Sequence, residues 1–167
     1  QLRASVGDVA AYGVMVGAGE THFPAFALAL GFGGVFSGLI ATLPVLAGAL
    51  VQMATPAGVR LLRSHRRWVV ACAAVQVSSF LPLLAATWQG GMTRTGMFLA
   101  TTLYWSAGMA TAPAWNTWIG TLVPRRLRGP FFARRQVVSH VVLVTTLVAV
   151  GVLLEGMKER VLLGFAA

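Results

Sequence analysis

The stretch that decides the fold runs from residue 34 to residue 67 and reads GVFSGLIATLPVLAGALVQMATPAGVRLLRSHRR. Its first part, residues 34–53, contains no charged side chain, and its end carries Arg60, Arg63, Arg66 and Arg67. A helix of about 20 apolar residues crosses the roughly 30 Å hydrocarbon core of a bilayer. Arginines gather beside such spans on the cytoplasmic side. The stretch therefore predicts a transmembrane helix followed by a cytoplasmic turn.

The composition of the whole chain supports this interpretation. Of its 167 residues, 57% are hydrophobic and only 10% are charged, whereas a soluble domain carries about 25% charged residues. A net charge of +9 could suggest a nucleic-acid partner, but the arginines form short clusters between long apolar runs, which favours a membrane. The single cysteine, Cys72, excludes an intrachain disulfide framework and a Cys-rich metal site. We expect a polytopic membrane protein in contact with the lipid bilayer, without nucleic acid.

Four further apolar runs have the length of a membrane span. Together with residues 34–53 they predict one transmembrane domain over residues 1–167, with spans at about 6–30, 34–53, 68–88, 97–123 and 137–154. The spans must be helical because lipid cannot satisfy open backbone amides. Barrel strands would alternate in polarity, and these runs are uniformly apolar. The expected fold is an all-α membrane protein, a five-helix transmembrane bundle.

The connections between these runs alternate in charge. The second and third runs are joined by the arginine turn at 60–67, and the fourth and fifth by a turn with Arg125, Arg126, Arg128, Arg134 and Arg135. The connection at 31–33 has no basic residue, and the connection between the third and fourth runs has only Arg94. The positive-inside rule places the arginine-rich turns in the cytoplasm. We therefore expect a multi-pass protein of the inner (cytoplasmic) membrane with its N-terminus in the cytoplasm.

The first run carries ionisable residues at membrane depth, Glu20 and His22. Such a group costs about 2.5–3.5 kcal/mol on insertion scales and normally faces a protein interior or a watery cavity. Residues two apart point to nearly opposite sides of a regular helix. The two therefore form one site only if Gly19 and Pro24 break the helix. Two interpretations stay open: Glu20 is a solute- or proton-coupled position, or it lies near the outer interface or is satisfied by a neighbouring helix.

The fourth run has a mixed face, formed by Trp105, Met109, Ala112 and Asn116 at helical spacing. One interpretation is that this face lines a cavity, with Pro113 opening the local hydrogen-bond ladder. The alternative is that Trp115 and Trp118 are interfacial anchors at the cytoplasmic end. Elsewhere, the pairs Gly13/Gly17 and Gly34/Gly38 have the small-xxx-small spacing that lets helix backbones approach closely in lipid.

Known catalytic patterns are absent from the sequence. It has no H-E-x-x-H, no G-x-S-x-G, no P-loop and no pair of cysteines or histidines at metal spacing. Its four acidic residues are scattered at positions 8, 20, 155 and 159, so no acid/base pair can be argued. We expect neither an enzyme nor a metal site, and no cofactor.

Several motifs resemble the N-terminal half of a major facilitator superfamily transporter. The strongest is AWNTWIGTLVPRRLRG at 114–129, whose Arg128 and Gly129 form a basic turn into the fifth helix, followed by FARR at 132–135. FALALG at 26–31 and GLIATLP at 38–44 look like the family's first two helices. Gly58, Arg63, Arg66 and Arg67 match the spacing of the family's cytoplasmic loop motif. Leu62 stands where the family has its latching aspartate, and His65 where it has a glycine.

The resemblance implies a secondary transporter with twelve helices in two six-helix halves that rock against each other. It implies that the first and fourth helices line the substrate path, and the candidates on them are Glu20, His22, Trp105 and Asn116. The small-molecule solute is unknown.

Five spans alone cannot enclose a two-sided path, so three explanations stay open. The chain is part of a longer transporter and lacks its C-terminal half, or it assembles with a second copy or other membrane subunits, or it is a non-transporting subunit of a larger membrane complex, derived from a truncated transporter. The short apolar segment at 161–167 is similar to the opening of a sixth helix, which favours the first.

Overall fold

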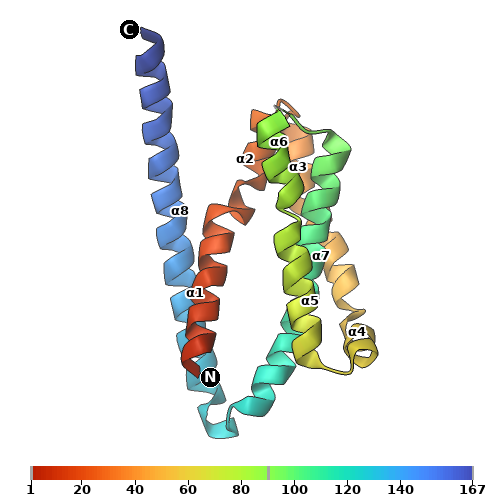
Figure 1. Ribbon diagram of the computed structural model, residues 1–167. Helices are drawn as coiled ribbons and strands as arrows, with labels where there is room; N and C mark the ends of the chain where they lie inside the picture. The colour runs from red at the N-terminus through yellow and green to blue at the C-terminus, as the bar shows by residue number, and fades with distance from the viewer. Residues whose placement is uncertain (1, 90, 167) are drawn as a thin grey trace. The chain divides into compact units, whose positions relative to one another are not determined.

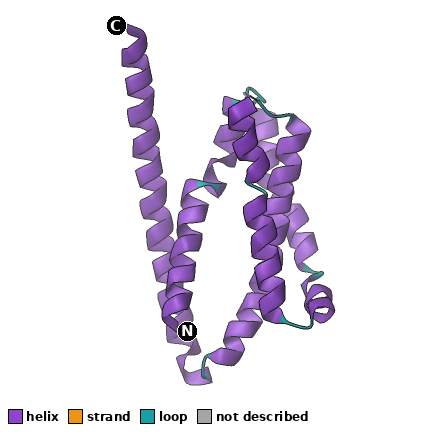
Figure 2. Cartoon of the chain, viewed as in Figure 1, coloured by secondary structure: helices purple, strands orange, loops and turns teal. Residues whose placement is uncertain are grey.

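The computed structural model describes the backbone of residues 2–89 and 91–166, and the side chains of residues 7–86, 88, 89 and 91–156. Within these ranges every regular element is a helix, and no strand occurs (Figure 2). The prediction of an all-α chain is confirmed.

The helices follow one another with short connections. In chain order the described residues form α1 (Leu2–Ala18), the 3-10 helix η1 (Glu20–His22), α2 (Phe23–Ala29), α3 (Gly34–Gln52), α4 (Thr55–Leu62), α5 (His65–Ser78), α6 (Leu81–Gln89), α7 (Arg94–Leu122), the 3-10 helix η2 (Arg125–Leu127) and α8 (Arg128–Ala166). Two of these helices, α5 and α7, begin with a side-chain cap. Ser64 Oγ accepts from the Arg67 N–H at 3.3 Å, and Thr93 Oγ1 accepts from the Gly96 N–H at 3.1 Å.

These helices belong to two compact units, which we describe separately. The terminal unit contains both ends of the sequence, Gln1–His22 and Arg126–Ala167. The middle unit contains Phe23–Arg125.

In the terminal unit, α1 lies along α8 and runs in the same direction (Figure 1). Two glycines of α1 make this contact close. A Cβ atom at Gly13 would lie 3.0 Å from the Ser139 carbonyl oxygen, and one at Gly17 would lie 2.7 Å from the Leu143 carbonyl oxygen. The Gly13/Gly17 pair is therefore a packing motif, as its spacing suggests. The other pair behaves differently, because a Cβ atom at Gly34 or Gly38 would meet nothing within 4 Å.

In the middle unit, α7 is the central helix, with α3 and α5 packed on it. Gly48 of α3 lies against the Trp105 backbone, where an added Cβ would be 2.8 Å from the Trp105 carbonyl oxygen. Gly108 of α7 similarly lies against the Gln76 side chain of α5, where an added Cβ would be 2.6 Å from Nε2. Small residues and a buried polar side chain thus bring these helices together.

Two of the expected spans are interrupted. The first apolar run is divided among α1, η1 and α2, with the break at Gly19–His22. The third is divided between α5 and α6, with Ser79 and Phe80 in the gap. Pro24 and Pro82 follow the two breaks and cannot donate a backbone hydrogen bond to the preceding turn. At the second break, the buried Ser79 Oγ donates to the Gln76 carbonyl at 2.6 Å. It thereby satisfies a carbonyl of the kind that a helix end leaves without a backbone donor.

Three stretches of helix are long and apolar enough to cross a membrane: Gly34–Gln52, His65–Ala86 and Arg125–Gly156. They correspond to the second, third and fifth expected spans. The first and fourth are not among them for different reasons. The break leaves α1 with 17 residues, and α7 is 29 residues long but contains many threonine, glycine and tryptophan residues.

Candidate functional site

The substrate-path candidates of the first run lie in the break between α1 and α2. Glu20 and His22 are the first and last residues of η1, and both are half-buried. Thr21 lies between them; its Oγ1 donates to the Gly17 carbonyl at 3.2 Å and lies 3.1 Å from His22 Nδ1. The geometry of a regular helix, which would send Glu20 and His22 to opposite sides, therefore does not apply here.

The candidates of the fourth run lie on α7 in different surroundings. Trp105 is half-buried, and its ring meets the Tyr104 ring edge-on with centroids 6.0 Å apart. Met109 lies beside Gly48 of α3, whereas Ala112 and Asn116 are exposed within the middle unit. The face predicted from helical spacing is thus covered by α3 along its first half and open along its second.

An aromatic cluster at the second break was not singled out from the sequence. The Tyr104 ring, which is 1% exposed, meets the Phe23 ring at 5.2 Å and the Phe80 ring at 5.3 Å, both edge-on. Phe23 and Phe80 are themselves 5.9 Å apart. Such pairs contribute about 0.5–1.5 kcal/mol each beyond the area they bury. The signal that could have found the cluster is the position of Phe23 and Phe80 beside Pro24 and near Pro82, where the helices break.

The residues of the loop motif are divided between two helices: Gly58 lies on α4, Arg63 follows the end of α4, and Arg66 and Arg67 lie in the first turn of α5. Gly58 is buried, and the Trp68 ring occupies the space in which a Cβ atom of residue 58 would lie. Arg63, Arg66 and Arg67 are exposed. Glycine is thus required for packing at position 58, while the three arginines are available to the surroundings.

The second arginine turn leads into α8. Arg128 is half-buried and Gly129 is exposed, with nothing within 4 Å of an added Cβ. About two turns further along α8, Arg135 Nη2 donates to Asp8 Oδ2 of α1 at 3.2 Å. Asp8 is 61% exposed, so this ion pair contributes little to stability, but it joins the arginine turn to the start of α1.

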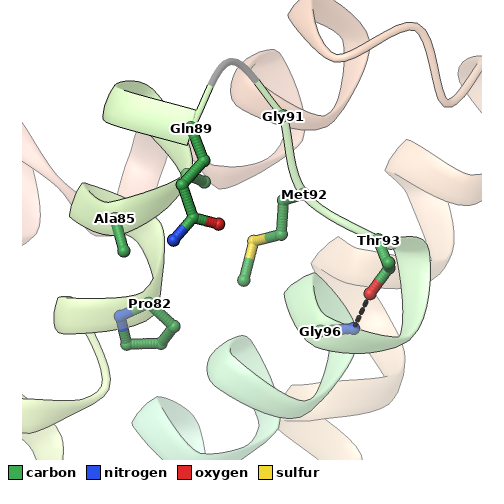
Figure 3. Close-up of a pocket in the computed structure, with 8 residues that line it drawn as sticks. Pro82, Ala85, Gln89, Gly91, Met92, Thr93 and Gly96 are labelled. Atoms are coloured by element: carbon green, nitrogen blue, oxygen red, sulfur yellow. Dashed lines mark hydrogen bonds between the residues drawn. The ribbon is translucent and has the colours of Figure 1, made fainter.

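A cavity of about 460 Å³ lies between α6 and the start of α7 (Figure 3). Its described lining carries no charged side chain, and the Gln89 and Met92 side chains extend into the space between the two helices. None of the substrate-path candidates lines it. Among the described residues, no group of three His, Cys, Asp or Glu side chains could hold a metal ion.

The middle unit has two chemically different ends. At one end, the Arg94 guanidinium lies over the Phe32 and Phe36 rings, 5.7 and 6.0 Å from their centroids, and so joins the two arginine-poor connections. The turn at Arg63–Ser64, between α4 and α5, lies at the opposite end (Figure 1).

Comparisons of this chain with protein-family models, curated protein sequences and solved structures found no match in any of the three.

Proposed function

We propose that this chain is an integral membrane protein of the secondary-transporter type, similar to the first five helices of a major facilitator superfamily transporter. Its all-helical structure and three helical stretches of membrane-spanning length and composition support the proposal. The sequence motifs at 58–67 and 114–135 support the choice of family.

The observation that carries the proposal is the broken first run. Transporters commonly place substrate and ion sites where a membrane helix is discontinuous, and an ionisable residue at membrane depth is expensive unless it serves such a site. Here the break at Gly19–His22 contains both Glu20 and His22. A helix that only anchors or packs has no need for these residues at its interruption.

The ends of the middle unit support the proposed orientation in the inner membrane. The two arginine-poor connections meet at Arg94, and the arginine turn lies at the other end, which is the separation that the positive-inside rule requires. In the terminal unit, α1 and α8 run in the same direction, as a first and a fifth span must. The N-terminus is then cytoplasmic.

Substitution of Glu20 tests the transport proposal directly. The full gene product is reconstituted in liposomes that contain a pH-sensitive dye, and sugars, amino acids and organic ions are added one class at a time. We expect at least one class to drive proton movement in the wild type, and Glu20→Gln to abolish it while membrane insertion is kept. Glu155→Gln, the same change at an exposed position near the end of the fifth span, should transport normally. Uptake by Glu20→Gln with an unchanged pH profile would remove Glu20 from the mechanism.

A second candidate function is a non-transporting helical subunit of a larger membrane complex. It is favoured by α8, whose Val137, Val141, Val144 and Val148 are 55–63% exposed and could pack against a partner. A subunit would co-purify with other membrane proteins in a fixed ratio. No solute would raise its thermal stability, whereas a transporter is stabilised by its solute through mass action.

A further inference from the structure

The short helix α4 is fixed to the middle unit by its inner face. Thr55 Oγ1 and Trp68 Nε1 both donate to the Ala110 carbonyl of α7, each at 3.0 Å. Gly58 lies against the Trp68 ring. Because Thr55 and Gly58 are both buried, α4 has a fixed inner side and therefore a fixed outer side.

The connection from α3 to α5, which contains α4, exposes both basic and apolar side chains. Arg60 and Arg63 on and after α4, and Arg66 and Arg67 at the start of α5, are all exposed. On the same connection from α3 to α5, Leu61 is 82% exposed and Met53 is 78% exposed. Among the described residues, no acidic side chain forms an ion pair with any of these four arginines. We call these six residues the α4 platform.

The place of the α4 platform in the chain puts it at a membrane surface. It connects two of the three candidate spans, Gly34–Gln52 and His65–Ala86. At that depth, arginines can reach the phosphate layer while leucine and methionine side chains enter the acyl boundary, as in interfacial amphipathic helices. Guanidinium groups bind phosphate oxygens with two parallel hydrogen bonds, and clusters of basic residues beside a span attract anionic lipids.

We propose that the α4 platform binds the phosphate groups of anionic phospholipids in the arginine-rich leaflet. This inference rests on the proposed membrane function. An RNA or an acidic protein segment would satisfy the arginines but would leave Leu61 and Met53 in water, so a lipid is the better occupant. The platform would retain a shell of anionic lipid around the second and third spans.

Native mass spectrometry of the full chain in neutral detergent tests the proposal. The chain is titrated with dioleoyl phosphatidylglycerol or, separately, with dioleoyl phosphatidylcholine, and the affinity for the first bound lipids is compared. We expect a preference for phosphatidylglycerol that falls at least tenfold in Arg63→Gln/Arg66→Gln, because each basic residue near the surface changes the affinity about fivefold. The charge-retaining variant Arg63→Lys/Arg66→Lys should keep most of the preference, and Leu61→Ser should lower it.

The matched control is Arg125→Gln/Arg126→Gln, which removes two exposed arginines from the other arginine turn. It should lower the affinity for the first bound phosphatidylglycerol less than Arg63→Gln/Arg66→Gln does, because the α4 platform stays intact. Equal losses in the two double Arg→Gln variants, or equal binding of the two lipids by the wild type, would overturn the proposal. Displacement of phosphatidylglycerol by an equal concentration of polyuridylate would overturn it in favour of RNA. Alkaline carbonate washing separates this question from the proposed function, because release of the wild type from membranes would contradict the membrane assignment whatever the lipid titration gives.

Discussion

At the scale of single residues, Gly13 and Gly17 resemble Gly48 and differ from most other glycines, because the backbone of another helix lies against them. Gly17→Ala would bring a methyl group within 2.7 Å of the Leu143 carbonyl oxygen and within 2.9 Å of Thr146 Cβ, so α1 and α8 would have to separate. Overpacking of this kind costs about 1–3 kcal/mol. We expect a clear fall in the melting temperature of the detergent-solubilised chain, measured by circular dichroism.

The matched control is Gly38→Ala, at a position of the same small-xxx-small spacing where an added Cβ meets nothing within 4 Å. It should leave the melting temperature unchanged or raise it slightly, since alanine is the better helix former by about 1 kcal/mol. Equal effects of the two changes would contradict the packing described for α1 and α8. The sequence alone could not separate the two glycine pairs, because spacing describes one helix and close packing is a property of two.

At the scale of elements, the break between α5 and α6 depends on one buried hydroxyl. Ser79→Ala would leave the Gln76 carbonyl without the donor it has at 2.6 Å, and an unsatisfied buried acceptor costs about 1–3 kcal/mol. Ser78→Ala removes a neighbouring hydroxyl that is exposed and donates to the Val75 carbonyl, so its effect should be close to zero. The measurement is the free energy of unfolding of both variants in the same detergent. A lower free energy of unfolding for Ser78→Ala than for Ser79→Ala would refute the role given to Ser79.

The element boundaries show where hydropathy predicts structure and where it does not. Residues 34–53 and 97–123 were expected as helices and correspond closely to α3 and α7, because a long uncharged run in lipid can satisfy its backbone only as a helix. Hydropathy did not predict the helix breaks at Gly19–His22 and Ser79–Phe80. They depend on local hydrogen-bond donors such as Ser79 Oγ and on the absence of a backbone N–H at Pro24 and Pro82. A hydropathy average over an apolar run carries no information about either. The helix α4 was also not predicted, because its docking needs the distant Ala110 carbonyl.

The candidate site was predictable only in part, for a similar reason. The cost of ionisable residues in lipid draws attention to Glu20 and His22 without any structure. The cluster of Phe23, Phe80 and Tyr104 joins three elements, and residue spacing within one helix cannot reveal it. The face from Trp105 to Asn116 has the expected spacing, but only the position of α3 decides which part of it is covered.

At the scale of the whole molecule, the proposed orientation predicts opposite accessibility for two exposed positions of the middle unit. In a Cys72→Ser background, which removes a buried thiol, Thr95→Cys at the start of α7 should react with a membrane-impermeant maleimide on intact cells. Ala57→Cys on α4 should react only after the cells are opened. Labelling of both positions from the same side would contradict the orientation. Labelling of Ala57→Cys alone on intact cells would reverse it.

The two donors that converge on the Ala110 carbonyl have a mechanical consequence. Since Thr55 and Trp68 share this acceptor on α7, a displacement of α4 or of the start of α5 would act on the backbone of α7 at Ala110. With the α4 platform at the lipid headgroups, as proposed above, a change in leaflet packing or thickness that moves α4 would reach α7 within two turns of Tyr104 and Trp105. Bilayer thickness would thereby become an input to the conformation of the protein interior.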